Sequence, residues 1–201
     1  MEKQYYTEHS FTTSVFSFDP TKNMASAGGG CVATNNEEIK EKVNLLRNHG
    51  VKDRGNHDTL GYNFKMSDVS AAILIEQLKK IEEILDKRIR NADFYAKIFS
   101  DLDWLVTPNV KDNTLHSFHK YVIKVIGRER DYVIKKLDEK GVGNGIYYHK
   151  PIHKQKVYLD LGYKDSLPVA EKVAEQVLSL PVHPNLTQEE LEYISEVMHN
   201  I

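Results

Sequence analysis

Apolar residues recur at helical spacing in several stretches of the chain. In residues 37–49 they fall at intervals of three and four, after Asn36 and before Gly50. Asparagine is a common N-cap and glycine commonly follows a helix, so we predict a helix over this range. From residue 67 to 100 the same spacing continues without glycine or proline. A helix of that length would reach about 50 Å, more than a small domain, and we interpret it as a link between two lobes.

Shorter apolar runs predict strands. Two of them, residues 15–18 and 31–34, flank a turn of small residues. Two more strands are predicted later in the chain, at residues 121–126 and 142–148. Residues 51–66 are predicted to form a long polar loop, and loops of that length are often functional.

Further helices are predicted toward the C-terminus, at residues 129–140 and at about 167–180. The last helix is predicted to begin at Thr187, because Thr187 and Glu190 have the spacing of a capping box. Strands and helices therefore mix along the whole chain, which indicates an α/β protein whose last part is a small α+β domain.

Composition and charge narrow the range of partners and compartments. The 201 residues include 27 basic and 29 acidic side chains, a formal net charge of −2, so no nucleic acid partner is expected. The single cysteine, Cys31, cannot form an internal disulfide, which indicates a reducing compartment. The N-terminal residues are polar and no apolar run is long enough to span a membrane, so we expect a soluble cytoplasmic protein.

Nine histidines raise the question of a metal site. His149 and His153 have a spacing that would suit one helix face, but Pro151 lies between them and breaks a helix interior. His116 and His119 form a second close pair. Neither pair has a cysteine or carboxylate at ligand spacing, so no metal site is expected.

One lysine, Lys22, lies in the turn between the first two predicted strands, with hydroxyl groups around it at Ser17, Thr21 and Ser26. An amine on a flexible stem condenses with an aldehyde when its neutral form is accessible, so Lys22 is a candidate for Schiff-base chemistry. Taken alone, however, a lysine is more often a solvated surface charge. The glycine run at 28–30 is not a Walker loop, because no Gly-Lys-Ser/Thr follows it.

The segment SFDPTKNMASAGGG around Lys22 resembles the lysine segment of the DegT/DnrJ/StrS family of sugar aminotransferases, which depend on pyridoxal 5'-phosphate (PLP). There, Ser-Phe-x-Pro-Thr-Lys-Asn ends a strand and a glycine pair follows. The resemblance implies that Lys22 is the catalytic lysine that forms the aldimine with the cofactor, and that Ser17 binds the cofactor phosphate. One residue departs from the pattern: Gly28 stands where the family usually has a glutamate.

Two further segments resemble the same family. GYNFKMSD, residues 61–68, is similar to the loop whose asparagine reaches the cofactor phosphate of the other subunit, which implies this role for Asn63. The segment from Gly145 to His153 resembles the one that lines the sugar-nucleotide side of the neighbouring active site, so Tyr148 and His153 are expected to bind substrate. Because family positions matching Asn63 and His153 act in trans, a homodimer is expected.

The resemblance covers nearly all of this chain but only the C-terminal half of the family fold. It implies the C-terminal part of a fold-type-I PLP aminotransferase, with a remnant of the large domain, a long linking helix and a small α+β domain. The corresponding boundaries are residues 1–66 for the partial, lysine-bearing large domain, 67–107 for the interdomain helix and linker, and 108–201 for the small domain.

In the family, the carboxylate that pairs with the pyridine nitrogen and the ring that stacks on the cofactor lie upstream of the lysine, whereas only 21 residues precede Lys22. Asp19, beside a proline, is not expected to replace that carboxylate. Three interpretations stay open. The chain is a piece of an aminotransferase for keto-sugar nucleotides that needs an N-terminal partner half, or a catalytically inactive truncated homologue with a structural, binding or regulatory role. The third is a PLP-dependent sugar dehydratase, against which the presence of Lys22 counts.

Overall fold

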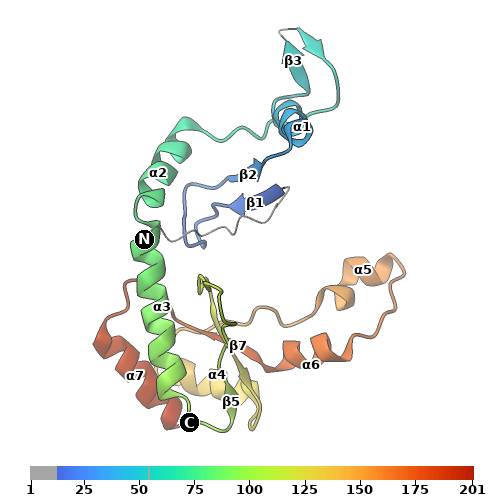
Figure 1. The fold of residues 1–201 in the computed structure, drawn as a ribbon. Helices are drawn as coiled ribbons and strands as arrows, with labels where there is room; N and C mark the ends of the chain where they lie inside the picture. Colours follow the sequence, from blue (N-terminus) through green and yellow to red (C-terminus); the bar gives the residue numbers. More distant parts are fainter. Residues whose placement is uncertain (1–12, 54) are drawn as a thin grey trace. The chain divides into compact units, whose positions relative to one another are not determined.

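The computed structural model describes residues 13–53 and 55–201 (Figure 1). The chain divides into two compact units, residues 1–82 and residues 83–201. Short antiparallel sheets and helices build both units, and no helix in the described ranges is long and apolar enough to cross a membrane.

The first unit contains two hairpins and two helices. Strands β1 and β2 pair in an antiparallel manner, with Ser17 opposite Gly30, so the turn that carries Lys22 connects them. Both predicted strands are therefore confirmed, whereas the predicted loop over residues 51–66 contains a short hairpin. The elements are β1 (Thr13–Ser17), β2 (Gly30–Thr34), α1 (Glu37–Arg47), β3 (Val51–Asp53), β4 (Asn56–His57) and α2 (Asp68–Leu78).

The predicted caps of α1 are present. Asn36 Oδ1 accepts a hydrogen bond from Ile39 N at 3.1 Å, which satisfies one of the free amides at the helix start. At the other end His49 and Gly50 have positive φ angles of 59° and 69°, and these turn the chain out of the helix. Local sequence therefore marks where α1 begins and where the chain leaves the helix.

The first unit has almost no apolar core of its own. Among its described residues, Phe18 is the only buried apolar side chain. Helix α2 is rich in apolar residues, yet its one buried residue is Ser70. Apolar burial, which stabilises most domains, therefore contributes little within this unit. The exposed apolar side chains of α2 are Val69, Ile73, Ile75 and Leu78, at 71%, 43%, 56% and 56% exposure.

The single helix predicted over residues 67–100 is wrong, because two helices, α2 and α3 (Ile81–Ile98), occupy this stretch. The turn between them lies at Lys79 and Lys80. Lys80 N donates to Gln77 O at 3.0 Å, a bond of the 3₁₀ type that tightens the last turn of α2. No glycine or proline marks this position, so the spacing of apolar residues does not reveal the break.

The second unit is built on one three-stranded antiparallel sheet in the order β5–β6–β7. The strand predicted at 121–126, the helix predicted at 129–140 and the capping box of Thr187 and Glu190 are all confirmed. The elements after α3 are β5 (Leu105–Val106), β6 (Tyr121–Val125), α4 (Arg130–Glu139), the 3₁₀ helix η1 (Ile152–Lys154), α5 (Lys156–Asp160), α6 (Pro168–Gln176), β7 (Val177–Leu180) and α7 (Gln188–His199).

Two predictions for the second unit are wrong. The end of the helix predicted over 167–180 is strand β7, whose four residues are all buried. A short, largely apolar run fits a buried strand as well as a helix, so the spacing of its apolar residues does not distinguish the two. The strand predicted over 142–148 is also missing: only Gly145 pairs there, through two backbone hydrogen bonds to Ser179 of 3.2 and 2.7 Å.

A continuous apolar core joins the helices and the sheet of the second unit. Its largest fully buried side chains are aromatic: the Tyr95 ring lies 5.3 Å from Phe99 and 5.1 Å from Tyr121 between centroids. Burial raises the pKa of Tyr95 and of Tyr121, so both hydroxyls stay neutral across the physiological range. The second unit is therefore held together by the apolar burial that the first unit lacks.

His199 connects the end of α7 to the turn that follows α3. Its Nδ1 lies 2.8 Å from Ser195 O, and its Nε2 lies 3.2 Å from Asp101 Oδ1. The Ser195 carbonyl raises the pKa of His199 above its usual value; burial opposes this rise and the Asp101 carboxylate adds to it.

The raised pKa predicts that this connection depends on pH. The protonated ring stabilises the fold, so its contribution is complete below the unfolded pKa of about 6.5 and is lost as pH rises through the higher folded pKa. Between about pH 6 and about pH 9, we expect the wild-type melting temperature to fall by roughly 1–3 °C more than that of His199→Gln. Thermal unfolding measures this difference, with the exposed His149→Gln as control. Parallel curves for wild type and His199→Gln would contradict the prediction.

Candidate functional site

Lys22 lies in a closed loop, residues 18–29, whose ends are held together by backbone hydrogen bonds. Phe18 N donates to Gly29 O at 2.9 Å, and Ser26 N donates to Phe18 O at 3.0 Å. Phe18 and Ser26 are buried, whereas Lys22 is partly exposed. The loop therefore presents the lysine amine from a base that hydrogen bonds hold in place.

Asp19 shapes the turn that leads to Lys22. Its Oδ1 accepts hydrogen bonds from Thr21 N at 2.9 Å and from Thr21 Oγ1 at 2.7 Å, and its carbonyl accepts from Lys22 N at 2.9 Å. The Thr21 donors, and to a smaller extent the charge of Lys22, hold the pKa of the Asp19 carboxyl below its usual value. Asp19 is therefore engaged within the turn itself.

Ser17 is the last residue of β1 and stands at the entrance of the lysine loop. Its side chain is exposed, and its Oγ accepts only a long hydrogen bond of 3.5 Å from Asp19 N. A hydroxyl can donate and accept at once. The hydroxyl of Ser17 can thus still donate a hydrogen bond to an acceptor.

The loop that contains Asn63 is fixed to the end of α1 by its backbone. Tyr62 N donates to Leu46 O at 2.6 Å. Phe64 N donates to Arg47 O at 3.0 Å. These two bonds satisfy carbonyls that a helix end leaves without partners, and they hold the exposed Asn63 between them.

Two glycines permit this close contact. A Cβ atom at Gly61 would lie 1.9 Å from Gly50 N, and one at Gly50 would lie 1.8 Å from Thr59 O. Neither distance is possible for real atoms, so any larger residue would displace the loop from the helix end. The placement of Asn63 therefore depends on two residues that carry no side chain.

Met66 connects the Asn63 loop to the lysine loop. A Cβ atom at Gly29 would lie 2.8 Å from Met66 Cε, so the methionine side chain lies against this glycine. Gly28 and Gly29 have φ angles of 106° and 105°, a region that favours glycine. A residue with a side chain would therefore be strained at Gly28 or Gly29 in this backbone.

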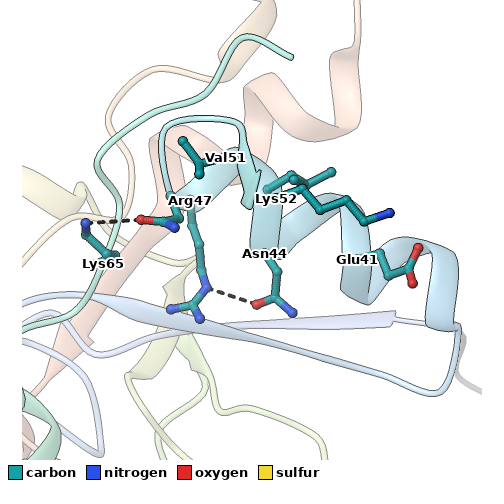
Figure 2. A pocket seen from close by; sticks show the side chains of 8 residues that line it. Glu41, Asn44, Arg47, Val51, Lys52 and Lys65 are labelled. Carbon is teal, nitrogen blue, oxygen red and sulfur yellow. Dashed lines mark hydrogen bonds between the residues drawn. The ribbon is translucent and has the colours of Figure 1, made fainter. Parts of the chain in front are cut away.

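A hollow of about 390 Å³ lies at the end of α1, beside the Asn63 loop (Figure 2). Three cationic side chains, Arg47, Lys52 and Lys65, line it together with one carboxylate, Glu41. Lys65 Nζ donates to the neutral amide oxygen of Asn48 at 3.2 Å, so this contact leaves its charge uncompensated. The hollow therefore suits an anionic group. Sequence reasoning missed it, because only the folded chain brings Lys65 beside Arg47 and Lys52.

Tyr148 and His153 lie in the second unit and differ in their surroundings. Tyr148 is 73% exposed, and its ring lies 5.5 Å from that of Tyr147 in an edge-to-face arrangement. The His153 side chain is only 9% exposed, and its Nε2 lies 3.0 Å from Glu171 Oε1. Sequence reasoning also missed Glu171, although an acidic residue in the first helical turn after a proline is a usable signal.

The five predicted site residues thus fall into two groups. The structure brings the loops of Lys22 and Asn63 together through Met66 in the first unit. Tyr148 and His153 belong to the second unit. Within residues 13–53 and 55–201, no three histidine, cysteine or acidic side chains gather where they could hold a metal ion.

Residues 7–199 match the model of the DegT/DnrJ/EryC1/StrS aminotransferase family. The chain belongs to this family. It is 38% identical over 189 residues to the "Pleiotropic regulatory protein" of Geobacillus stearothermophilus, covering 92% of this chain and 50% of the relative. It is also 38% identical over 184 residues to a UDP-N-acetyl-3-dehydro-alpha-D-glucosamine 3-aminotransferase of Acidithiobacillus ferrooxidans, covering 91% of this chain and 49% of that enzyme.

The family's solved structures share the fold. DesV of S. venezuelae, solved with a ketimine intermediate, superposes with a TM-score of 0.89 at 28% identity, covering 94% of this chain and 51% of DesV. Spr1654 of Streptococcus pneumoniae, solved in a PLP form and a PMP form, superposes with a TM-score of 0.86 in each. The chain spans about half the length of the curated relatives it matches, and its α/β fold corresponds to about half of a family chain.

The glycine contact predicts how the Asn63 loop responds to mutation. Gly61→Ala introduces a Cβ that cannot fit against Gly50, so we expect the loop to leave the end of α1. The amides of Tyr62 and Phe64 then exchange with solvent at least about tenfold faster, since each loses its hydrogen bond.

Amide hydrogen exchange measures this effect. Gly143→Ala is the control, because a Cβ atom there meets nothing within 4 Å. Unchanged protection of Tyr62 and Phe64 in Gly61→Ala would show that the loop is held by something else.

Proposed function

We propose that this chain is an aminotransferase-type protein that transfers an amino group to a keto-sugar nucleotide, in amino-sugar or polysaccharide biosynthesis. It corresponds to the C-terminal part of a fold-type-I PLP enzyme and needs an N-terminal partner half to complete its active site. The closed loop that presents Lys22 beside the Asn63 loop carries this proposal. Family membership and the PLP and PMP forms of Spr1654 support it.

The described residues fit part of the cofactor. Lys22 offers an amine for the cofactor aldehyde, while the Ser17 hydroxyl and the Asn63 amide suit the phosphate. The Asp19 carboxylate is engaged by Thr21, so we assign none of the described residues to the pyridine nitrogen. We therefore expect the partner half to supply the carboxylate that pairs with the pyridine nitrogen.

The proposed reaction gives each residue of this chain a defined task. PLP, when bound, supplies the electron sink that acidifies the α-carbon of the amino donor. Lys22 Nζ would hold the cofactor through its aldehyde and would serve as the base for the α-proton of the amino donor. Ser17 and Asn63 orient the phosphate; because family positions matching Asn63 and His153 act across subunits, we also propose a homodimer of the assembled protein.

The exposed apolar surface of the first unit supports the proposal that an N-terminal half binds to it. A hollow of about 450 Å³ beside β1 and α1 is lined largely by apolar residues, among them Val15 at 77% exposure and Phe64 at 70% exposure. Together with the exposed face of α2, it forms the kind of surface that proteins normally cover. A partner that supplies the other half of the family fold would cover both.

The charge of the basic hollow supports the proposal that the substrate is a nucleotide sugar. A nucleotide diphosphate carries negative charges that three cations, Arg47, Lys52 and Lys65, can neutralise. The hollow lies in the same unit as Lys22, at the end of the helix that fixes the Asn63 loop. We therefore propose that it binds the diphosphate.

The central prediction concerns Lys22. PLP is added to the chain with and without an N-terminal half taken from a full-length family member, followed by borohydride reduction and peptide mapping. With the N-terminal half present, we expect the reduced adduct at Lys22 alone and transamination of a keto-sugar nucleotide. Lys22→Ala removes both, because no second amine lies in the closed loop.

The matched control is Lys42→Ala, a lysine on the exposed side of α1, which should keep the adduct and the activity. Adducts scattered over several lysines, or turnover retained by Lys22→Ala, would contradict the assignment. The comparison with and without the N-terminal half shows whether the chain by itself binds the cofactor.

A second prediction concerns the basic hollow. In the assembled protein, Lys65→Ala should raise KM for the nucleotide sugar about tenfold with little change in kcat, since it removes one charge-assisted contact. The loss should shrink at high salt, where such contacts are screened. Steady-state kinetics measures it, again with Lys42→Ala as the control. An unchanged KM would mean that the diphosphate binds elsewhere.

A second candidate function is a catalytically inactive homologue with a structural, binding or regulatory role. The 38% identity to a relative named "Pleiotropic regulatory protein" favours it. So does Gly28 in place of the family's glutamate. No adduct at Lys22 in the presence of an N-terminal half would favour this function over transamination.

A further inference from the structure

Three donors of the second unit converge on one oxygen atom, Oε1 of Glu171. His153 Nε2 lies 3.0 Å from it, Lys154 Nζ lies 3.3 Å from it, and Leu167 N donates to it at 2.9 Å. The hydrogen bond from His153 is the main reason why the pKa of Glu171 falls to about 2, and Leu167 N and Lys154 add to it. Glu171 is therefore a carboxylate throughout the physiological pH range.

Besides His153, the start of α6 also holds this carboxylate. Glu171 lies in the first turn of α6, and its side chain folds back onto the amide of the N-cap residue, Leu167. Leu167 has no capping side chain of its own, so Glu171 satisfies an amide at the helix start. The start of the helix thus holds the Glu171 carboxylate, and this carboxylate in turn holds the His153 ring.

His153 is unusual within its surroundings. It sits in the 3₁₀ helix η1, where neighbouring Ile152 is 70% exposed, yet its own side chain is only 9% exposed. Its contact to Glu171 joins η1 to α6 across 18 residues of sequence. The ring is therefore anchored within a segment that is otherwise open to solvent.

The chemistry of the contact determines which ring nitrogen carries hydrogen. A carboxylate only accepts hydrogen bonds, so Nε2 must be the donor. In the neutral ring, Nδ1 then carries the lone pair, and within the described part of the chain the hydrogen bond of the ring is made by Nε2 alone. Lys154 already balances the charge of Glu171, so His153 does not have to be protonated to keep this contact.

We propose that Glu171 is a positioning residue for His153: it holds the ring through Nε2 and leaves Nδ1 to accept a hydrogen bond from a hydroxyl group of the nucleotide sugar. This proposal rests on the proposed function, since it takes His153 as a substrate-binding residue. It adds Glu171 to the residues that serve this function. It also gives the direction of the hydrogen bond to the substrate: a sugar hydroxyl donates and His153 Nδ1 accepts.

Nuclear magnetic resonance of the whole chain, with ¹⁵N-labelled histidine and no substrate, tests the positioning. We expect an imidazole N–H signal from His153 that exchanges slowly with solvent. Its loss in His153→Gln distinguishes it from the N–H signals of His57 and His199, whose ring nitrogens also make hydrogen bonds. Glu171→Ala should remove this signal, because Nε2 loses its acceptor. Lys154→Ala is the matched control, since it removes another donor to Glu171 and should leave the signal in place.

Glu171→Gln keeps the experiment decisive if Glu171→Ala fails to fold, since it retains an acceptor oxygen for Leu167 and loses the charge. Its His153 signal should remain and exchange faster than in wild type. A slow signal that persists unchanged in Glu171→Ala, or its absence from wild type, would overturn the positioning role.

In the assembled protein, Glu171→Ala should raise KM for the nucleotide sugar on the order of tenfold and change kcat little, as expected when an orienting partner is lost. An unchanged KM, with the N–H signal lost, would overturn the sugar contact and leave the positioning intact. Absence of transamination in wild type would count against the proposed function, while the resonance experiment still decides the role of Glu171.

Discussion

Backbone hydrogen bonds, and not an apolar core, place the functional loops of the first unit. The end of α1 offers carbonyls that a helix cannot satisfy itself, and the Asn63 loop supplies the amides. The lysine loop is closed in the same way, by bonds from Phe18 and Ser26. Such bonds direct the chain accurately but stabilise it little in water, by about 1 kcal/mol each. This explains how a unit can hold a defined site and still leave its apolar side chains uncovered.

The second unit, in contrast, is held together by an apolar core. Its helices and sheet share one apolar core, in which Tyr95 stacks on Phe99. The segment with Tyr148 and His153 lies outside this core. It is attached by the backbone hydrogen bonds of Gly145 to Ser179 and by the contact of His153 to Glu171. A stable scaffold that carries a solvated segment with a few fixed points is a common arrangement for binding residues.

The sequence predicted those features that local chemistry determines. The caps at Asn36 and Thr187 and the strands on either side of Lys22 were confirmed, because a side chain a few residues away is enough to produce them. The features it missed depend on distant contacts. The run at 177–180 became a strand because β6 pairs with it, and Glu171 meets His153 only after the chain has folded. The basic hollow likewise gathers cations from a helix, a strand and a loop.

The junction between α6 and β7 has a consequence for how this family can diversify. The helix ends at Gln176 and the strand begins at Val177, with no loop between them. An insertion there would shift the register of β7 against β6 and turn buried side chains outward. Insertions and deletions are tolerated far better in the exposed stretch before Pro168. Evolution can therefore reshape what surrounds His153 by changing the length of that stretch, while the carboxylate that holds the ring stays tied to the sheet.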